Sequence, residues 1–217
     1  MIHIDCSKEQ LNFSQYDLAQ DEIYVIDNLF PWWFVYHLDK TILHGFGWQY
    51  GLCSGHKQNA DGTADFDYDK GADLSLEVPC FKQSIYPPMS ESAQDSAYGM
   101  IYNAVTATIP FELELGEILV NGQQYIHDTV IHQDCSCDNG LSWIYYVNKR
   151  WDEQWGGPTI IEFNGEDVEI LPKPGRICFF KGCIPHRGAP PNGDYYHGLR
   201  ASLVYKTMRK NPLPSKK

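Results

Sequence analysis

Hydrophobic residues in the first part of the chain are spaced for a strand and then a helix. Residues 22–27 predict a strand. Pro31 suits the first turn of a helix, and Phe34, Leu38 and Ile42 follow it at four-residue spacing. We therefore expect a strand followed by an amphipathic helix.

A second helix is predicted before Pro110. Residues 92–95 have the form of a capping box, and Ala97, Ile101 and Val105 continue one helical face beyond it. A proline cannot continue a helix, so Pro110 marks its end. We expect this segment to be a second packing helix.

Between the two predicted helices lies a segment with little periodicity. Residues 51–88 are rich in Gly, Asp, Ser and Pro, which predicts a long loop. Loops of this length often close over a site, so we interpret the segment as a substrate lid carrying Tyr68, Phe81 and Tyr86.

From residue 111 onward the pattern changes to short hydrophobic runs separated by turn residues. The predicted strands are 117–120, 130–134, 141–147, 159–163, 168–171, 176–180 and 199–206. Many short strands at close spacing are typical of a jelly-roll or barrel-like sandwich. The expected fold class is therefore mainly β, with packing helices.

Length and composition favour one domain. The chain has 217 residues, of which 43% are hydrophobic, and this is enough for a single core. We expect one domain over 1–209. About 1–110 would supply helical support and the lid, about 111–209 the β core that carries the chemistry, and 210–217 a flexible tail.

The net charge and the cysteine count indicate which partners and which cellular compartment to expect. The net charge of −11 disfavours nucleic acid, because affinity for phosphates comes mostly from Lys and Arg. Seven cysteines are an odd number, and the chain opens with no charged-then-apolar leader. No apolar stretch approaches the roughly 18 residues of a membrane helix. We expect reduced thiols, a cytoplasmic location and no membrane partner.

His132 and Asp134 are the first candidates for a metal site. Side chains alternate across a strand, so these two share one face while Gln133 points to the other. His186 would join them from another strand of the same barrel. Two histidines and one carboxylate are typical of iron(II) oxygenases, because they leave coordination positions open.

Two other pairs of residues in the sequence have metal-binding side chains at close spacing. His37 and Asp39 have the same spacing but lie on the predicted helix, where positions two apart diverge. Cys135 and Cys137 beside a histidine could hold zinc, although the remaining cysteines are scattered and supply no second pair. We favour these two as thiols in the loop that leaves the metal strand.

Arg200, Ser202 and Tyr146 are candidates for binding a dicarboxylate cosubstrate. Arg200 and Ser202 share one face of the last predicted strand. A guanidinium fork binds a carboxylate through two parallel hydrogen bonds, and hydroxyls of Ser202 or Tyr146 can complete its shell. The alternatives are a surface salt bridge for Arg200 and a core position for Tyr146.

The stretch 117–208 resembles the prolyl 4-hydroxylase-like branch of the iron(II)- and 2-oxoglutarate-dependent oxygenases. The motifs that carry the resemblance, in family order, are Tyr125, His132-Gln133-Asp134, the run 143–151, Gly156-Gly157, the run 171–176, Phe179-Phe180, Pro185-His186 and Arg200. The run 143–151 is especially similar to cytoplasmic protein-prolyl hydroxylases, including oxygen sensors. Asn121 stands where the animal sensors have tyrosine, and 126–129 is an insertion, so the substrate stays open.

The resemblance implies a double-stranded β-helix of the jelly-roll or cupin-like kind. It implies iron(II) held by His132, Asp134 and His186, and 2-oxoglutarate bound by Arg200 with support from Tyr146. Ascorbate is a candidate reductant. The implied reaction is hydroxylation of a prolyl residue in a protein or peptide, with succinate and CO2 as coproducts. The alternatives are hydroxylation of a small molecule or another residue, nucleic-acid demethylation, and a non-oxidising metal-binding jelly-roll.

Overall fold

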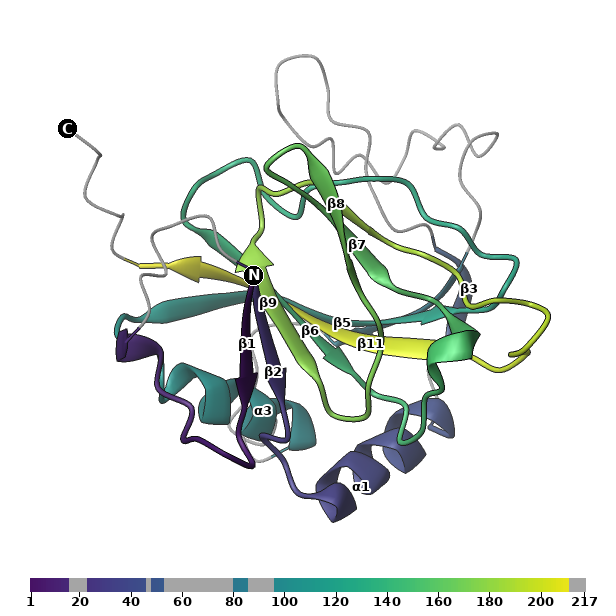
Figure 1. Ribbon diagram of the computed structural model, residues 1–217, viewed down its shortest axis with the longest axis horizontal. Coiled ribbons are helices and arrows are strands. Elements are labelled where there is room, and N and C mark those ends of the chain that lie inside the picture. Colours follow the sequence, from purple (N-terminus) through teal and green to yellow (C-terminus); the bar gives the residue numbers. More distant parts are fainter. Residues whose placement is uncertain (16–22, 46–47, 53–79, 86–95, 211–217) are drawn as a thin grey trace.

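The structure is a computed structural model that describes residues 1–15, 23–45, 48–52, 80–85 and 96–210 (Figure 1). Its strands are β1 (Ile2–Asp5), β2 (Tyr24–Asp27), β3 (Gln49–Leu52), β4 (Cys80–Ile85), β5 (Leu113–Gln123), β6 (Gly140–Tyr146), β7 (Thr159–Phe163), β8 (Glu166–Ile170), β9 (Ile177–Lys181), β10 (His186–Gly188) and β11 (Arg200–Arg209). Its helices are α1 (Trp32–Leu43) and α3 (Ala97–Thr106), with short 3-10 turns η1 (Phe13–Gln15) and η2 (Glu153–Trp155).

Within the described residues, the strands form two sheets that face each other. The large sheet has the order β1-β2-β9-β6-β11-β5-β4-β3, and the small sheet has the order β10-β7-β8. Neighbouring strands are antiparallel apart from the parallel pair β1–β2. The expected fold is confirmed: the chain is mainly β with two described helices, and the two sheets form a double-stranded β-helix (Figure 1).

Alternation along the strands gives the large sheet two different faces. One face packs against α1 and α3, which lie together below the sheet in Figure 1. The strand residues on this helix-covered face include Trp143, Tyr145, Phe179, Leu203 and Tyr205. Their neighbours in sequence point the other way, toward the small sheet, and include Ile144, Tyr146, Cys178, Phe180 and Val204. This second face, which we call the inner face, carries the candidate site.

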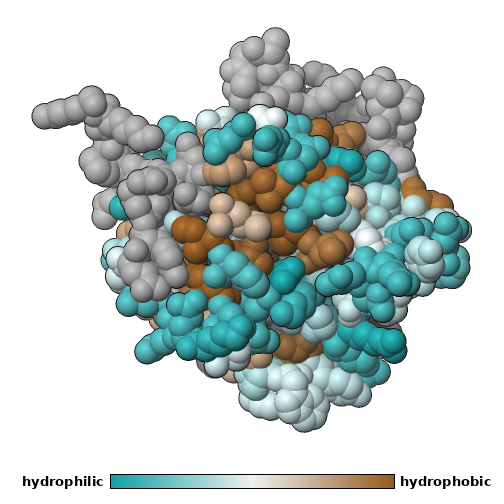
Figure 2. Space-filling model, in the orientation of Figure 1, coloured by the Kyte–Doolittle hydropathy of each residue, from teal (hydrophilic) through white to brown (hydrophobic). Residues whose placement is uncertain are grey.

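The molecular surface in the same orientation is mixed. Figure 2 shows hydrophobic residues at the centre of this view, where β9 and β7 lie in Figure 1, with hydrophilic residues around them. Among the described residues, no helix has the length and hydrophobicity needed to cross a membrane.

Both predicted helices are present, with different starts. Pro31 is the N-cap of α1 rather than a residue of its first turn. Ser96 caps α3 by accepting a hydrogen bond from the backbone N–H of Gly99. The predicted capping box at 92–95 lies outside the described residues.

The long loop predicted over 51–88 is wrong at its two ends. Residues 51–52 belong to β3 and 80–85 form β4, which pairs with β3 and with β5. These strands were missed because their pairing partners, not their local composition, hold them in the sheet. Phe81 therefore lies in a strand, where its ring contacts those of Tyr50 and His127. Tyr68 and Tyr86, like the tail 211–217, lie outside the described residues.

Candidate active site

His132, Asp134 and His186 come together as the sequence predicts. Their potential ligand atoms all lie within 4.8 Å of one another, and no other group of three metal-binding side chains occurs in the described part of the chain. His186 Nε2 is 3.4 Å from Asp134 Oδ2, and His132 Nε2 is 3.9 Å from Asp134 Oδ1. The donor set of two imidazoles and one carboxylate fits iron(II).

Backbone carbonyls orient both imidazoles. Nδ1 of His132 lies 3.1 Å from the carbonyl oxygen of Val130, and Nδ1 of His186 lies 2.9 Å from that of Ile184. A carbonyl oxygen can only accept, so Nδ1 carries the proton in each ring. Nε2 is thereby left with a lone pair for a metal, which is the usual outer arrangement of a ligating histidine.

The charge states of His132 and Asp134 suit metal binding. Burial, together with neighbouring His186, lowers the pKa of His132 to about 4, so this imidazole is neutral at pH 7. Burial opposes ionisation of Asp134, but His186, Lys206 and His132 outweigh it and hold the pKa of the carboxyl below its usual range. A neutral imidazole and an ionised carboxylate are the forms that bind a cation.

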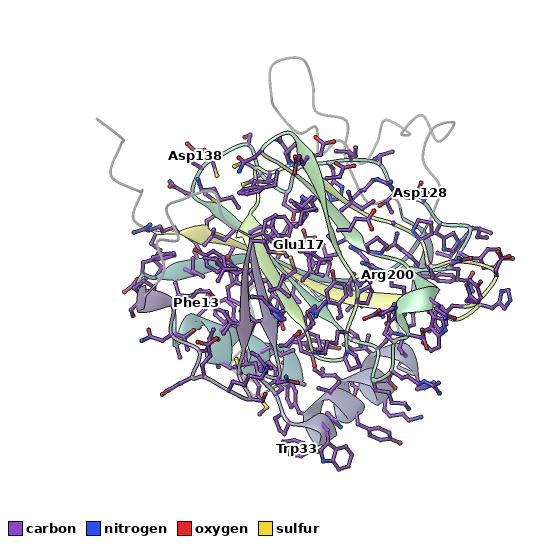
Figure 3. The ribbon with its side chains drawn as sticks, viewed as in Figure 1. Phe13, Trp33, Glu117, Asp128, Asp138 and Arg200 are labelled. Atoms are coloured by element: carbon purple, nitrogen blue, oxygen red, sulfur yellow. The ribbon has the colours of Figure 1, made fainter. Side chains whose placement is uncertain are left out.

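The strand predicted over 130–134 is wrong. This segment has no regular structure apart from a single antiparallel bridge between His132 and His186. Backbone N–H groups of His132 and Asp134 donate to the carbonyls of His186 and Gly182, respectively. The ligands converge because the segment is tied residue by residue to the chain around β10. In Figure 3, Asp128 and Asp138 lie near its two ends.

Two side chains of the large sheet contact Asp134 and a third contacts one of them, and the sequence analysis did not predict this role. Ser142 Oγ donates to Asp134 Oδ2 at 2.6 Å, and Lys206 Nζ lies 3.2 Å from Asp134 Oδ1. Glu117 Oε2 lies 3.2 Å from the same ammonium. Burial opposes the charge of Lys206, but Asp134 and Glu117 raise its pKa above the usual value. The available signal was alternation, because Lys206 shares a strand face with Arg200 and Ser202.

Arg200 is on the same inner face and is almost completely buried, with 2% of its surface exposed. Its Nε donates to the carbonyl of Gly157 at 2.6 Å. Its two terminal nitrogens donate to Gln123 Oε1 at 2.8 Å and to Thr159 Oγ1 at 3.1 Å. All these acceptors are neutral. The proposed alternative of a surface salt bridge is therefore excluded.

No carboxylate among the described residues pairs with the Arg200 guanidinium. Burial lowers the pKa of Arg200, with the Tyr146 side chain opposing the shift. A buried cation without an anion is costly unless something else neutralises it. The site thus fits an anionic ligand such as the distal carboxylate of 2-oxoglutarate.

Tyr146 and Ser202 lie where the sequence places them, on the same face as Arg200. Ser202 pairs in register with Tyr146 on β6 and with Asn121 on β5. The Tyr146 hydroxyl donates to Thr159 Oγ1 at 2.7 Å, and the Arg200 guanidinium carbon is 5.5 Å from the Tyr146 ring centroid. Tyr146 is a core aromatic whose hydroxyl reaches the acceptor of Arg200, and its role in binding a cosubstrate stays a prediction.

Gly157 has a physical role in this pocket. It has a φ of +68°, and a Cβ at this position would lie 3.0 Å from Arg200 Cδ. Only glycine therefore lets the chain pass this close to the guanidinium and accept from it.

Cys135 and Cys137 do not form a described metal site. Neither forms a disulfide, and Cys135 Sγ donates to the carbonyl of Cys137 at 3.3 Å. The thiols lie in the irregular segment that follows Asp134.

Comparison with known proteins adds a family. Residues 120–204 match the model of the 2OG-Fe(II) oxygenase superfamily, a stretch that contains all six candidate residues. No protein in the curated collection of characterised sequences matches the chain.

Several solved structures share the fold. A Pseudomonas putida prolyl-4-hydroxylase is 18% identical, with a TM-score of 0.58, covering 89% of this chain and 96% of that one. A Trichoplax adhaerens prolyl hydroxylase, solved with a peptide fragment of the hypoxia inducible factor oxygen degradation domain, is 14% identical, with a TM-score of 0.60, covering 91% and 87%. A Burkholderia pseudomallei oxidoreductase of the 2OG-Fe(II) oxygenase family is 12% identical, with a TM-score of 0.61, covering 100% and 99%. At these identities the likeness concerns the fold alone.

Proposed function

We propose that this chain, whose residues 120–204 match the 2OG-Fe(II) oxygenase superfamily, is an iron(II)- and 2-oxoglutarate-dependent oxygenase that hydroxylates a prolyl residue in a protein or peptide, with succinate and CO2 as coproducts. The observation that carries the oxygenase reaction is the His132, Asp134 and His186 cluster beside a buried arginine that lacks an anion. The prolyl substrate is supported by the likeness in fold to two prolyl hydroxylases and by the similarity of residues 143–151 to such enzymes.

In this proposal each candidate residue has one task. His132, Asp134 and His186 would hold iron(II) and leave the other coordination positions for cosubstrate and O2. Arg200 would bind the distal carboxylate of 2-oxoglutarate, while Ser202 and Tyr146 hydroxyls complete the shell. When bound, iron(II) and 2-oxoglutarate supply the O2-dependent oxidation of a substrate C–H bond. The protein supplies orientation and a site shielded from water.

The neighbouring residues hold the Arg200 guanidinium in place before any ligand binds. Thr159 accepts from both Tyr146 and Arg200, and Gln123 accepts from Arg200 while donating to the carbonyl of Gly188. These bonds fix the direction of the guanidinium, which reduces the reorganisation needed on binding.

We also propose one domain over 1–209, a cytoplasmic location, for which the odd number of seven cysteines is an argument, and ascorbate as reductant on the resemblance. The net charge of −11 supports a basic or neutral substrate rather than nucleic acid.

The test is turnover with a panel of proline-containing peptides, iron(II), 2-oxoglutarate and O2. We expect a peptide to gain one oxygen atom by mass spectrometry, at proline, with an equal amount of succinate. His186→Ala should form neither product, and the same peptide with alanine at the target should remain unchanged. Succinate without peptide oxidation points to another substrate, such as a small molecule. No succinate with folded, metal-loaded protein means a non-oxidising metal-binding jelly-roll.

A further inference from the structure

Three side chains lie side by side on the inner face next to Asp134: Ser142 and Lys206 contact its carboxylate, and Glu117 contacts Lys206. Lys206 on β11 pairs in register with Glu117 on β5 and with Ser142 on β6. We call these the Glu117–Lys206–Ser142 row. Figure 3 labels Glu117, which lies at a different position along the sheet from Arg200. Glu117 and Lys206 are outside the stretch 120–204 that matches the superfamily.

Each oxygen of the Asp134 carboxylate has one donor from this row. Ser142 Oγ donates to Oδ2 at 2.6 Å, and Lys206 Nζ is 3.2 Å from Oδ1. Partners of this kind orient a ligating carboxylate and change how strongly it binds a metal. A hydroxyl and an ammonium differ in one respect, since only the ammonium brings a full positive charge next to a cation site.

The positive charge of Lys206 lowers the affinity of the site for a metal ion. The Asp134 side chain is 5% exposed, so its interactions are only weakly screened by water. A cation held by the ligand carboxylate repels a bound metal ion, and the repulsion grows with the charge of the ion. Glu117 acts in the opposite direction, because its carboxylate partly neutralises Lys206 at 3.2 Å.

We propose that Lys206 is a positioning residue that tunes the metal through Asp134: it weakens the carboxylate as a ligand and favours the divalent over the trivalent ion, and Glu117 sets the strength of this effect. The proposal rests on the metal centre of the proposed function. It makes Lys206 and Glu117 act with opposite signs on the same metal, although they form one ion pair.

The experiment uses the full chain and three variants of the row. Lys206→Met removes the charge and keeps the length, Glu117→Gln removes the opposing charge, and Lys206→Arg keeps the positive charge. A matched control is the exposed pair of Lys210 and Glu112, whose charged atoms are 3.1 Å apart and which makes no contact with Asp134. Lys210→Met and Glu112→Gln therefore remove equivalent charges away from the site. Thermal unfolding checks that each variant is folded.

Two readouts are measured without turnover: anaerobic affinity for Mn(II), followed by tryptophan fluorescence, and the reduction potential of the iron-loaded protein. We expect Lys206→Met to bind Mn(II) about 10-fold more tightly and to have a lower potential, because a positive charge beside the metal is removed. Glu117→Gln should bind more weakly and have a higher potential. Lys206→Arg, Lys210→Met and Glu112→Gln should resemble the wild type.

The proposal is tested by the direction in which Lys206→Met and Glu117→Gln change Mn(II) affinity and reduction potential. If Lys206→Met and Glu117→Gln both weaken Mn(II) binding, the row is only a scaffold for Asp134 and the proposal is wrong. Unchanged affinity and potential in both variants also overturn it. If the wild type binds no metal, the proposed function fails together with this inference. A wild type that binds metal but hydroxylates no peptide overturns the prolyl substrate and leaves the opposite signs to be observed.

Discussion

Arg176 and Arg200 are both largely buried arginines, but only one has its anion within the described chain. Arg176 Nε and Nη2 donate to the two oxygens of Asp27 at 2.8 and 2.9 Å, which is a bidentate pair. Arg200 donates to Gly157, Gln123 and Thr159, all of them neutral. A guanidinium whose carboxylate comes from its own chain stabilises the fold. One surrounded by neutral acceptors is prepared for an anion from outside.

The buried carboxylates Asp27 and Asp134 differ in the groups that surround them. Asp27 is contacted by Arg176, by Lys173 Nζ at 3.0 Å and by His3 Nε2 at 2.9 Å, so its charge is neutralised where β2 meets the segment before β9. Asp134 has one cationic partner, Lys206 Nζ at 3.2 Å, and also faces two imidazoles that keep Nε2 available. The first cluster is closed, and the second is open to a cation.

The largest expected effect is a loss of unfolding free energy when the ion pair between Arg176 and Asp27 is removed. Arg176→Met removes the bidentate partner of a buried carboxylate, which typically costs about 3 kcal/mol or more of unfolding free energy. Urea denaturation measures this. The double variant Asp27→Asn with Arg176→Met should recover part of the loss, because it leaves no unpaired charge. Wild-type stability in Arg176→Met would mean that Lys173 and His3 alone satisfy Asp27.

Arg200→Met should behave in the opposite way. Without cosubstrate we expect a smaller loss of stability than in Arg176→Met, because no buried carboxylate loses its partner. Affinity for 2-oxoglutarate should fall by about 1.5–3 kcal/mol, or about 10- to 150-fold, since a charge-assisted pair is lost. Isothermal titration calorimetry with metal-loaded protein measures it. Arg176→Met serves as the control, and an equal loss of affinity there would remove the distinction between the two arginines.

The smallest expected effect is the loss of the stabilisation from Asp27 at acid pH. Burial opposes ionisation of Asp27, but Arg176, Lys173 and His3 outweigh it and hold its pKa below the usual range. In the unfolded chain the pKa of Asp27 is about 3.9. The stabilisation is therefore complete above that pH and is lost as the pH falls toward the folded pKa. The stability gap between wild type and Asp27→Asn, measured by urea denaturation, should shrink from pH 6 to pH 3. A constant gap contradicts this assignment.

Much of the site was predictable because its chemistry is local in sequence. His132, Asp134 and His186 are recognisable by residue type and order, and the alternation 200, 202 correctly places Arg200 and Ser202 on one face. The strand 159–163 was predicted with its observed bounds, since its hydrophobic run ends at a turn.

What could not be predicted depends on contacts between distant segments. Residues 130–134 are held by bonds to 182–186, not by a ladder, so a strand pattern gave the right ligands for a partly wrong reason. The ends of the 51–88 segment become β3 and β4 because β5 offers an edge. Lys206 gains its role from Glu117, almost ninety positions earlier in the chain.

The central claim is that the open cluster and Arg200 together hold iron(II) and 2-oxoglutarate. The most direct measurement is an anaerobic titration of the purified protein with both, followed by the visible charge-transfer band of the chelate. We predict a band in the wild type, no band in His186→Ala, and a band in Arg200→Met that needs much more 2-oxoglutarate. Folded wild-type protein that gives no band would contradict the account.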